Sequence, residues 1–248
     1  MSRIPISRRG FMIGTVAAGS AVTLPSAARE FSGNVHYEPG SANPPDMAPV
    51  GVPQFFTAEE QSFVEAAIDR LIPPDDWPGA KDLGVARFID SQLAGSFGRA
   101  EIWYMQGPWP KGEETQGYQS RLTPAQHYRS AIAAIDSHAR EKFENKKFSE
   151  LSAEDQDAIL KGLEEGKIEL KGTDGKTFFE LFLQNTVEGY FGDPVYGGNR
   201  DMMAWKMIGF PGARYDYRPY VKKHNQKLEL EPVSVAGTGS FSRRRAKE

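Results

Sequence analysis

Apolar residues recur at helical spacing from residue 57 onward, and this pattern gives the first prediction of structure. In the segment "TAEEQSFVEAAIDRLIPP", Thr57 and Glu60 have the spacing of a capping box, in which each side chain caps the other's backbone. Pro73 and Pro74 cannot continue a helix, so the helix is expected to end before them. Its apolar stripe consists of Phe63, Val64, Ala67, Ile68, Leu71 and Ile72.

Two further helices are expected in the first half of the chain. One covers residues 83–93, with Gly95 near its end. The other begins at "TPAQHYR", where Thr123 has the position of an N-cap and Gln126 closes a second capping box. Proline at the first helical position fits this start, because its missing N–H has no partner there in any case.

Three shorter patterns complete the helical part: a helix capped by Ser152, one over residues 176–191 and a last one over residues 200–208. No segment alternates apolar and polar residues as a half-buried strand would. The sequence therefore predicts an all-α fold, a small helical domain with extended N- and C-terminal arms. The expected parts are a leader (1–28), an N-terminal arm (29–56), the helical domain (57–212) and a C-terminal arm (213–248).

The helix expected over residues 176–191 has little polar surface. Glu180, Gln184 and Glu188 recur every four residues and form one narrow polar stripe, while apolar side chains cover most of the remaining circumference. A helix of this kind is buried on nearly all sides. It is either the core of this domain or partly covered by another subunit.

The next segment, "GYFGDPVYGGNRDMMAWKMIGFPG" (residues 189–212), combines glycines with aromatic and methionine side chains. Most of the glycines fit helix ends and turns, and Gly192 and Gly209 are expected in the left-handed conformation that ends a helix. Asn199 is expected to cap the last helix, with Asp201 favourable in its first turn.

Helix caps do not explain the apolar side chains of that last helix. Methionine adapts readily to contact surfaces, and tryptophan is a frequent interface anchor. Three interpretations stay open: core packing alone, core packing combined with a protein interface, and a ligand pocket. The candidate interface residues are Tyr190, Phe191, Tyr196, Met202, Met203, Trp205, Met207 and Phe210.

Composition narrows the possible chemistry. The 248 residues include no cysteine, which excludes disulfides, thiolate nucleophiles and Cys-ligated iron–sulfur clusters within this chain. The formal net charge is −3, and the only large basic block lies at the extreme C-terminus. Because nucleic-acid binding needs a basic face, no nucleic acid is expected as the main partner.

No combination of side chains in the sequence indicates catalysis or metal binding. None of the four histidines belongs to a metal-binding pattern, and His127 and His138 lie eleven residues apart on one helix, about 16 Å along its axis. Nucleophile-elbow and phosphate-loop motifs are absent. The acidic run over residues 152–169 is typical of a solvated helix face. We therefore expect no catalytic, cofactor-binding or metal-binding residue in this chain.

The N-terminus resembles a twin-arginine export signal. Arg8 and Arg9 are followed by Phe11 and a short, weakly apolar run that ends in small residues near Ala28. That run is too short to span a bilayer. Twin-arginine export carries folded proteins, often with a cofactor in place, yet this chain has no cofactor motif of its own. This contrast suggests that the signal serves a partner.

Three blocks of the chain resemble the gluconate 2-dehydrogenase small-subunit family (subunit 3, the gamma subunit). They are "FFTAEEQSFVEAAIDRLIPPDDWPGAKDLGVARFID", "GPWPKGEETQGYQSRLTPAQHYR" and the long, specific block "FFELFLQNTVEGYFGDPVYGGNRDMMAWKMIGFPG". Together they cover roughly residues 55–212. The twin-arginine leader fits the same family.

The resemblance implies partners and cofactors outside this chain. The large subunit of such complexes is an FAD-bearing dehydrogenase, expected also to hold an iron–sulfur cluster, and a multihaem cytochrome c subunit with haem c anchors the complex at the membrane. The small subunit supports export and stability of the flavoprotein in the periplasm and touches the membrane only through the complex. Gluconate is the expected substrate; sister complexes oxidise fructose, sorbitol, glucose or 2-ketogluconate. A free-standing periplasmic ligand-binding protein is the rival from another class.

Overall fold

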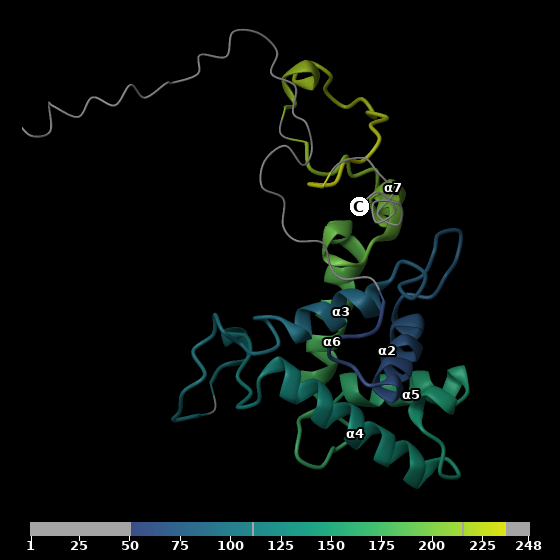
Figure 1. Cartoon of the computed structure of the whole chain (residues 1–248), viewed down its shortest axis with the longest axis vertical. Helices are drawn as coiled ribbons and strands as arrows, with labels where there is room; N and C mark the ends of the chain where they lie inside the picture. The colour runs from purple at the N-terminus through teal and green to yellow at the C-terminus, as the bar shows by residue number, and fades with distance from the viewer. Residues whose placement is uncertain (1–50, 111, 215, 237–248) are drawn as a thin grey trace, which may run out of the picture. The chain divides into compact units, whose positions relative to one another are not determined.

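The computed structural model describes residues 51–110, 112–214 and 216–236 (Figure 1). Within these ranges the chain forms six α-helices and no strand longer than an isolated bridge between Gly212 and Val233. The prediction of an all-α fold is confirmed. The expected export signal, with Arg8, Arg9 and Phe11, lies outside the described residues, as does most of the expected N-terminal arm.

The first helix, α2 (Ala58–Leu71), begins with the predicted capping box. The Thr57 hydroxyl accepts a hydrogen bond from the Glu60 N–H at 3.2 Å, and the Glu60 carboxylate accepts one from the Thr57 N–H at 2.9 Å. The buried residues of this helix are four from the predicted stripe: Phe63, Val64, Ala67 and Ile68. The next helix, α3 (Val85–Ala94), ends at Gly95 as expected.

The remaining helices are α4 (Pro124–Lys142), α5 (Ala153–Glu164), α6 (Gly175–Phe191) and α7 (Met203–Ile208). The capping box between Thr123 and Gln126 is present at the start of α4, and the Ser152 hydroxyl caps α5. These caps could be predicted from the sequence because a capping residue and its backbone partner are only three positions apart.

Helix α6 is the central element of the helical body and packs against α2, α3, α4, α5 and α7 (Figure 1). Phe178 and Phe182 stack on each other within it and contact Tyr128 of α4. The polar stripe of Glu180, Gln184 and Glu188 is exposed. The helix is therefore the core of this domain, and its apolar faces are covered largely by the chain itself.

Two buried polar side chains of α6 are satisfied within the core. The Asn185 amide donates to the Tyr128 hydroxyl oxygen at 2.8 Å, and the Thr186 hydroxyl donates to the Phe182 carbonyl oxygen at 2.7 Å. Because an unpaired buried polar group destabilises the folded state, these bonds allow polar residues to occupy the most buried helix.

A buried carboxylate on α3 fixes the chain that leads into α2. Asp90 is 4% exposed and accepts hydrogen bonds from the N–H groups of Gln54, Phe55 and Phe56 at 2.7–2.9 Å. Arg129 of α4 adds a bond to the Phe55 carbonyl oxygen at 2.7 Å and lies over the Phe55 ring. The end of the expected N-terminal arm is thus part of the folded body from Gln54 onward.

Two local predictions near the end of the helical part are wrong. Gly192 caps α6 in an extended conformation, with φ of −65°, and not in the left-handed one. Residues 200–208 are not one helix either: a 3-10 turn, Arg200–Met202, precedes α7, and Asp201 and Met202 have positive φ values of 56°. Asp201 therefore does not occupy a helical first turn. Gly209 does end α7 in the left-handed conformation, as predicted.

Candidate partner interface

The segment between α6 and α7 folds back tightly on the end of α6. A 3-10 turn, Pro194–Tyr196, follows Asp193 and ends at Gly197, whose φ is 112°. Gly198 lies against the backbone of Gly189, so closely that a Cβ atom at position 198 would overlap the Gly189 carbonyl. Glycine is required here because two backbone segments touch.

Asn199 holds this turn together from the inside. It is fully buried; its amide nitrogen donates to the Gly192 carbonyl oxygen at 2.9 Å, and its amide oxygen accepts from the Ala204 N–H at 3.0 Å. One side chain thereby joins the end of α6 to the first turn of α7. The role differs from a simple N-cap, since Asn199 itself has a φ of 42° and precedes two further residues with positive φ. Such conformations persist when surrounding contacts determine them strongly.

Trp205 of α7 fixes the other side of the same junction. Its indole N–H donates to the Phe191 carbonyl oxygen at 2.6 Å, and the side chain is 5% exposed. The Phe210 ring meets it edge-on, with ring centroids 5.1 Å apart. The indole therefore satisfies a carbonyl at the C-terminal end of α6, where helix carbonyls have no partner within the helix.

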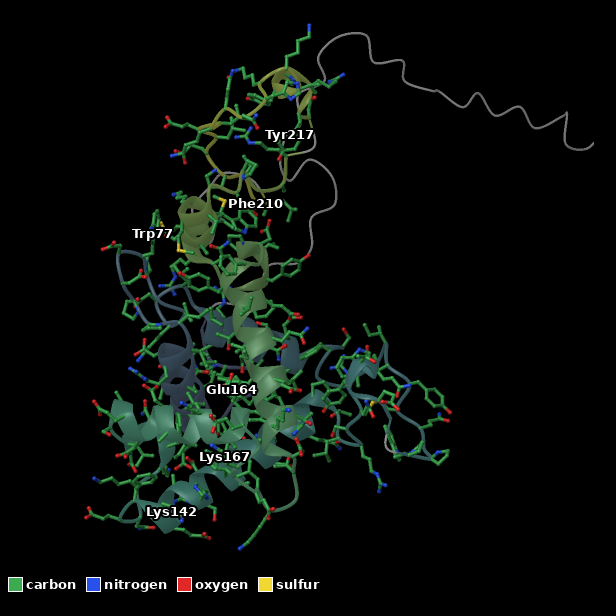
Figure 2. All side chains as sticks on the ribbon, turned by 180° about the vertical axis from the view of Figure 1, so that it is seen from behind. Trp77, Lys142, Glu164, Lys167, Phe210 and Tyr217 are labelled. Carbon is green, nitrogen blue, oxygen red and sulfur yellow. The ribbon has the colours of Figure 1, made fainter. Side chains whose placement is uncertain are left out.

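The structure separates the predicted interface residues into three groups. Tyr190, Met202 and Trp205 are buried within the chain, whereas Phe191, Met203 and Met207 are partly buried. Tyr196 and Phe210 are exposed, at 42% and 43%, and Figure 2 labels Phe210 beside α7. Of the eight predicted residues, Tyr196 and Phe210 are therefore the ones exposed enough for direct contact with a partner, and Trp205 packs against Phe210.

One exposed apolar residue of this segment is not among the predicted interface residues. Ile208, the last residue of α7, is 56% exposed. Val187 on α6 is 42% exposed. The signal for Ile208 was an apolar residue directly before the helix-ending Gly209, in the last turn, where Lys, Arg or His side chains can bond the free carbonyls.

The chain after α7 forms a loop whose two ends meet. The Ala213 N–H donates to the Val233 carbonyl oxygen at 2.6 Å, and the Val233 N–H donates to the Pro211 carbonyl oxygen at 3.2 Å. At Gly212, where φ is 74°, a Cβ atom would collide with the Val233 backbone. Residues 213–236 contain no α-helix among the described residues, and their two ends are joined by hydrogen bonds, so the described part of the expected C-terminal arm is a closed loop.

Asp193 fastens the end of this loop to the helical body. Its carboxylate accepts hydrogen bonds from the Ser234 hydroxyl at 2.7 Å, the Val235 N–H at 2.9 Å and the Val195 N–H at 3.0 Å. Val233, Ser234 and Ala236 are buried. The residue that starts the turn after α6 therefore also holds a segment 41 and 42 positions further along the chain.

Two histidines fall in described helices, and the structure does not bring them together. His127 is 1% exposed; its Nε2 lies 3.2 Å from the Asp174 carbonyl oxygen and its Nδ1 lies 3.0 Å from the Tyr118 hydroxyl. Burial lowers the pKa of His127, whereas the Asp174 carbonyl and carboxylate act in the opposite direction. His138 is partly exposed and lines a cleft of about 370 Å³ between α4 and residues 169–172.

Within the described part of the chain, no group of three or more His, Asp or Glu side chains is placed to hold a metal ion. None of the helices in that part combines the length and the apolar composition needed to cross a membrane.

The family model for gluconate 2-dehydrogenase subunit 3 matches residues 58–212. The chain belongs to the gluconate 2-dehydrogenase subunit 3 family. The matched range covers all six described helices and the whole turn between α6 and α7. No curated protein and no solved structure matched the chain. Membership of this subunit 3 family makes the chain a subunit of that kind of dehydrogenase complex.

Proposed function

We propose that this chain is the non-catalytic small subunit of a periplasmic, membrane-bound, FAD-dependent gluconate 2-dehydrogenase complex. The family match over residues 58–212 is the observation that carries the proposal. The folded segment around α7 supports it, since it exposes Tyr196, Ile208 and Phe210 while Asn199 and Trp205 fasten it to the end of α6. Apolar side chains that are fixed in position and exposed are characteristic of contact surfaces.

The chemistry is assigned to partner chains. Oxidation of gluconate to 2-ketogluconate converts the C2 alcohol to a ketone and releases two electrons and two protons. FAD bound to the large subunit would supply the two-electron chemistry, and the haem c of the cytochrome subunit would carry the electrons to quinone. This chain contributes binding surface, stability and export to the complex.

Export is assigned to the N-terminal segment. Arg8 and Arg9, with Phe11, fit a twin-arginine signal that carries the flavoprotein across the membrane already folded. The absence of cysteine from the chain supports a role as escort, because Cys-ligated redox centres must then belong to other subunits.

Affinity purification of the tagged chain from its native host tests the proposal. The purified sample is expected to show flavin absorbance, the haem c spectrum and gluconate-dependent reduction of an artificial acceptor. Fructose, sorbitol, glucose and 2-ketogluconate serve as comparison substrates, because activity with one of these alone would assign a sister complex. A monomeric chain that purifies without flavin would contradict the subunit role.

The export role is tested by replacing Arg8 and Arg9 with lysine. We expect the flavoprotein and its dehydrogenase activity to accumulate in the cytoplasm, measured by cell fractionation. Arg3→Lys is the matched control, since it makes the same change outside the pair and should leave periplasmic activity unchanged. Normal dehydrogenase activity in the periplasm of the double variant would contradict the escort role.

A further inference from the structure

The tip of the C-terminal loop has a charge opposite to that of the helical body. Residues 217–227, "YRPYVKKHNQK", contain four Lys or Arg and no carboxylate. Residues 51–212 contain 26 Asp and Glu against 17 Lys and Arg, a formal charge of −9. Such a separation of charge orients the protein as it approaches a charged partner.

Three lysines supply the available positive charge of this tip. Lys222, Lys223 and Lys227 are exposed, and none of them makes an ion pair with a carboxylate in the described ranges. Arg218 differs, because its guanidinium binds the Asp216 carboxylate with two bonds of 2.8 Å. Each of the three lysines therefore presents an ammonium group that is not paired with a carboxylate of the described residues.

Apolar side chains accompany the lysines. Val221 is 64% exposed and Tyr217, labelled in Figure 2, is 40% exposed. Ile208 and Phe210, exposed at the end of α7, lead directly into the same loop. Exposed apolar residues bordered by charge are the composition expected of a protein contact surface.

The loop is held at its base and is not needed for the core. The Asp193 carboxylate and the backbone bonds between residues 211–213 and Val233 close it, and Arg214 Nη2 donates to the Glu231 carbonyl oxygen at 2.7 Å. No residue of 217–227 belongs to the apolar core of the described chain. The tip is thus presented on a closed base, and its side chains can be changed without loss of core packing.

We infer that this basic tip, residues 217–227, docks on an acidic surface of the flavoprotein subunit, with Ile208 and Phe210 contacting an apolar area beside it. The inference rests on the proposed function, because it identifies the chemistry of the partner surface. The lysines accelerate association by attracting the acidic surface at long range, and the apolar residues bind after contact.

A protein surface fits the tip better than an anionic lipid surface does. Glu229 and Glu231 are exposed on the returning limb of the same loop, and the helical body carries nine net negative charges. A lipid bilayer of uniform negative charge would repel these groups, whereas a protein can place basic side chains opposite them.

Charge reversal of the tip tests this docking. The triple variant Lys222→Glu, Lys223→Glu and Lys227→Glu should lower the association rate with the purified flavoprotein by about tenfold or more and weaken or reverse the dependence of that rate on salt. The matched control reverses three exposed lysines outside the loop: Lys142 at the end of α4, labelled in Figure 2, with Lys161 and Lys171. The association rate of this control variant should stay within about twofold of the rate for the unmodified chain.

The outcomes separate the docking proposal from the proposed function. If the unmodified chain does not associate with the flavoprotein, the subunit role fails and the docking proposal fails with it. If the unmodified chain associates but the loop variant keeps its association rate and salt dependence, only the docking proposal is overturned. Binding to phosphatidylglycerol vesicles that the loop variant loses, with flavoprotein binding unchanged, would overturn it in favour of a lipid surface. Equal melting temperatures confirm that both variants are folded.

Discussion

The helical body from α2 to α6 and the segment over residues 192–236 are stabilised in different ways. The body buries apolar stripes around α6, where Phe178 and Phe182 pack against Tyr128. The later segment has short elements and depends on a few polar side chains, above all Asp193 and Asn199. Apolar burial is spread over many residues, whereas a hydrogen-bonded clamp depends on one. Single substitutions should therefore affect the two regions differently.

The largest effect is expected from a cavity in the body. Phe182 is fully buried, so Phe182→Ala should lower the free energy of unfolding by about 3–5 kcal/mol and the melting temperature by about 10 °C. Thermal unfolding followed by circular dichroism measures both. Val187→Ala, on the exposed side of the same helix, is the control and should change stability by less than about 0.5 kcal/mol. Equal losses in the two variants would contradict the central position of α6.

A smaller and more local effect is expected from the Asp193 clamp. Asp193→Ala removes the acceptor for Val195, Ser234 and Val235 and should cost about 1–3 kcal/mol. Because the loop base is then released, the amide hydrogens of Ala213 and Val233 should exchange about tenfold or more faster, while those of α6 stay protected.

Hydrogen exchange read by mass spectrometry measures this difference. Glu229→Ala is the control: Glu229 lies in the same loop, is exposed and makes no side-chain hydrogen bond to a described residue. Unchanged exchange at the loop base in Asp193→Ala would show that the apolar contacts of Val233 and Ala236 hold the loop without the carboxylate.

The smallest effect is expected from the buried histidine of the body and appears only on acidification. Burial holds the pKa of His127 below 6.5, so the unfolded chain binds more protons than the folded chain as pH falls through that value. His127 thus contributes stability that is complete above about pH 6.5 and is lost as pH falls toward its folded pKa.

Chemical denaturation between about pH 7.5 and pH 5 tests whether the free energy of unfolding falls on acidification in this way. His127→Gln should reduce the dependence of the unfolding free energy on pH, and the partly exposed His138 gives the control His138→Gln. Burial raises the pKa of Asp136, so this residue makes the folded chain relatively more stable on acidification. Its contribution is the same in both variants, because neither variant changes Asp136. A steeper dependence on pH in His127→Gln would refute the assignment.

The difference between the helical body and the segment over residues 192–236 also explains which features were predictable from sequence. The starts of α2 and α4 followed from capping boxes, and the buried face of α2 followed from its apolar spacing. Both signals are local, because the partners lie three or four residues apart. The interface prediction stays a prediction: Tyr196 and Phe210 are exposed, while Tyr190 and Trp205 are buried in the chain itself.

The polar clamps were not predictable in the same way. Asp90 accepts from residues about 35 positions earlier in the chain, and Asp193 accepts from residues about 40 positions later. Neither carboxylate differs in sequence from a solvated one. The broken helix at Asp201 and Met202 was missed for a related reason, since the Asn199 side chain bonds to Ala204 where a continuous helix would use its own backbone.

By itself, the sequence determined the helical class, the capped starts of α2, α4 and α5, the absence of cysteine and the resemblance to the subunit 3 family. Only the tertiary structure decided that α6 is covered by its own chain, that residues 213–236 form a closed loop, and that the apolar side chains of Tyr217 and Val221 in its basic tip are exposed. The reason is physical. Helical spacing and caps are set by neighbours within one or two turns, whereas burial and hydrogen bonding of a side chain depend on segments that the chain brings together only when it folds.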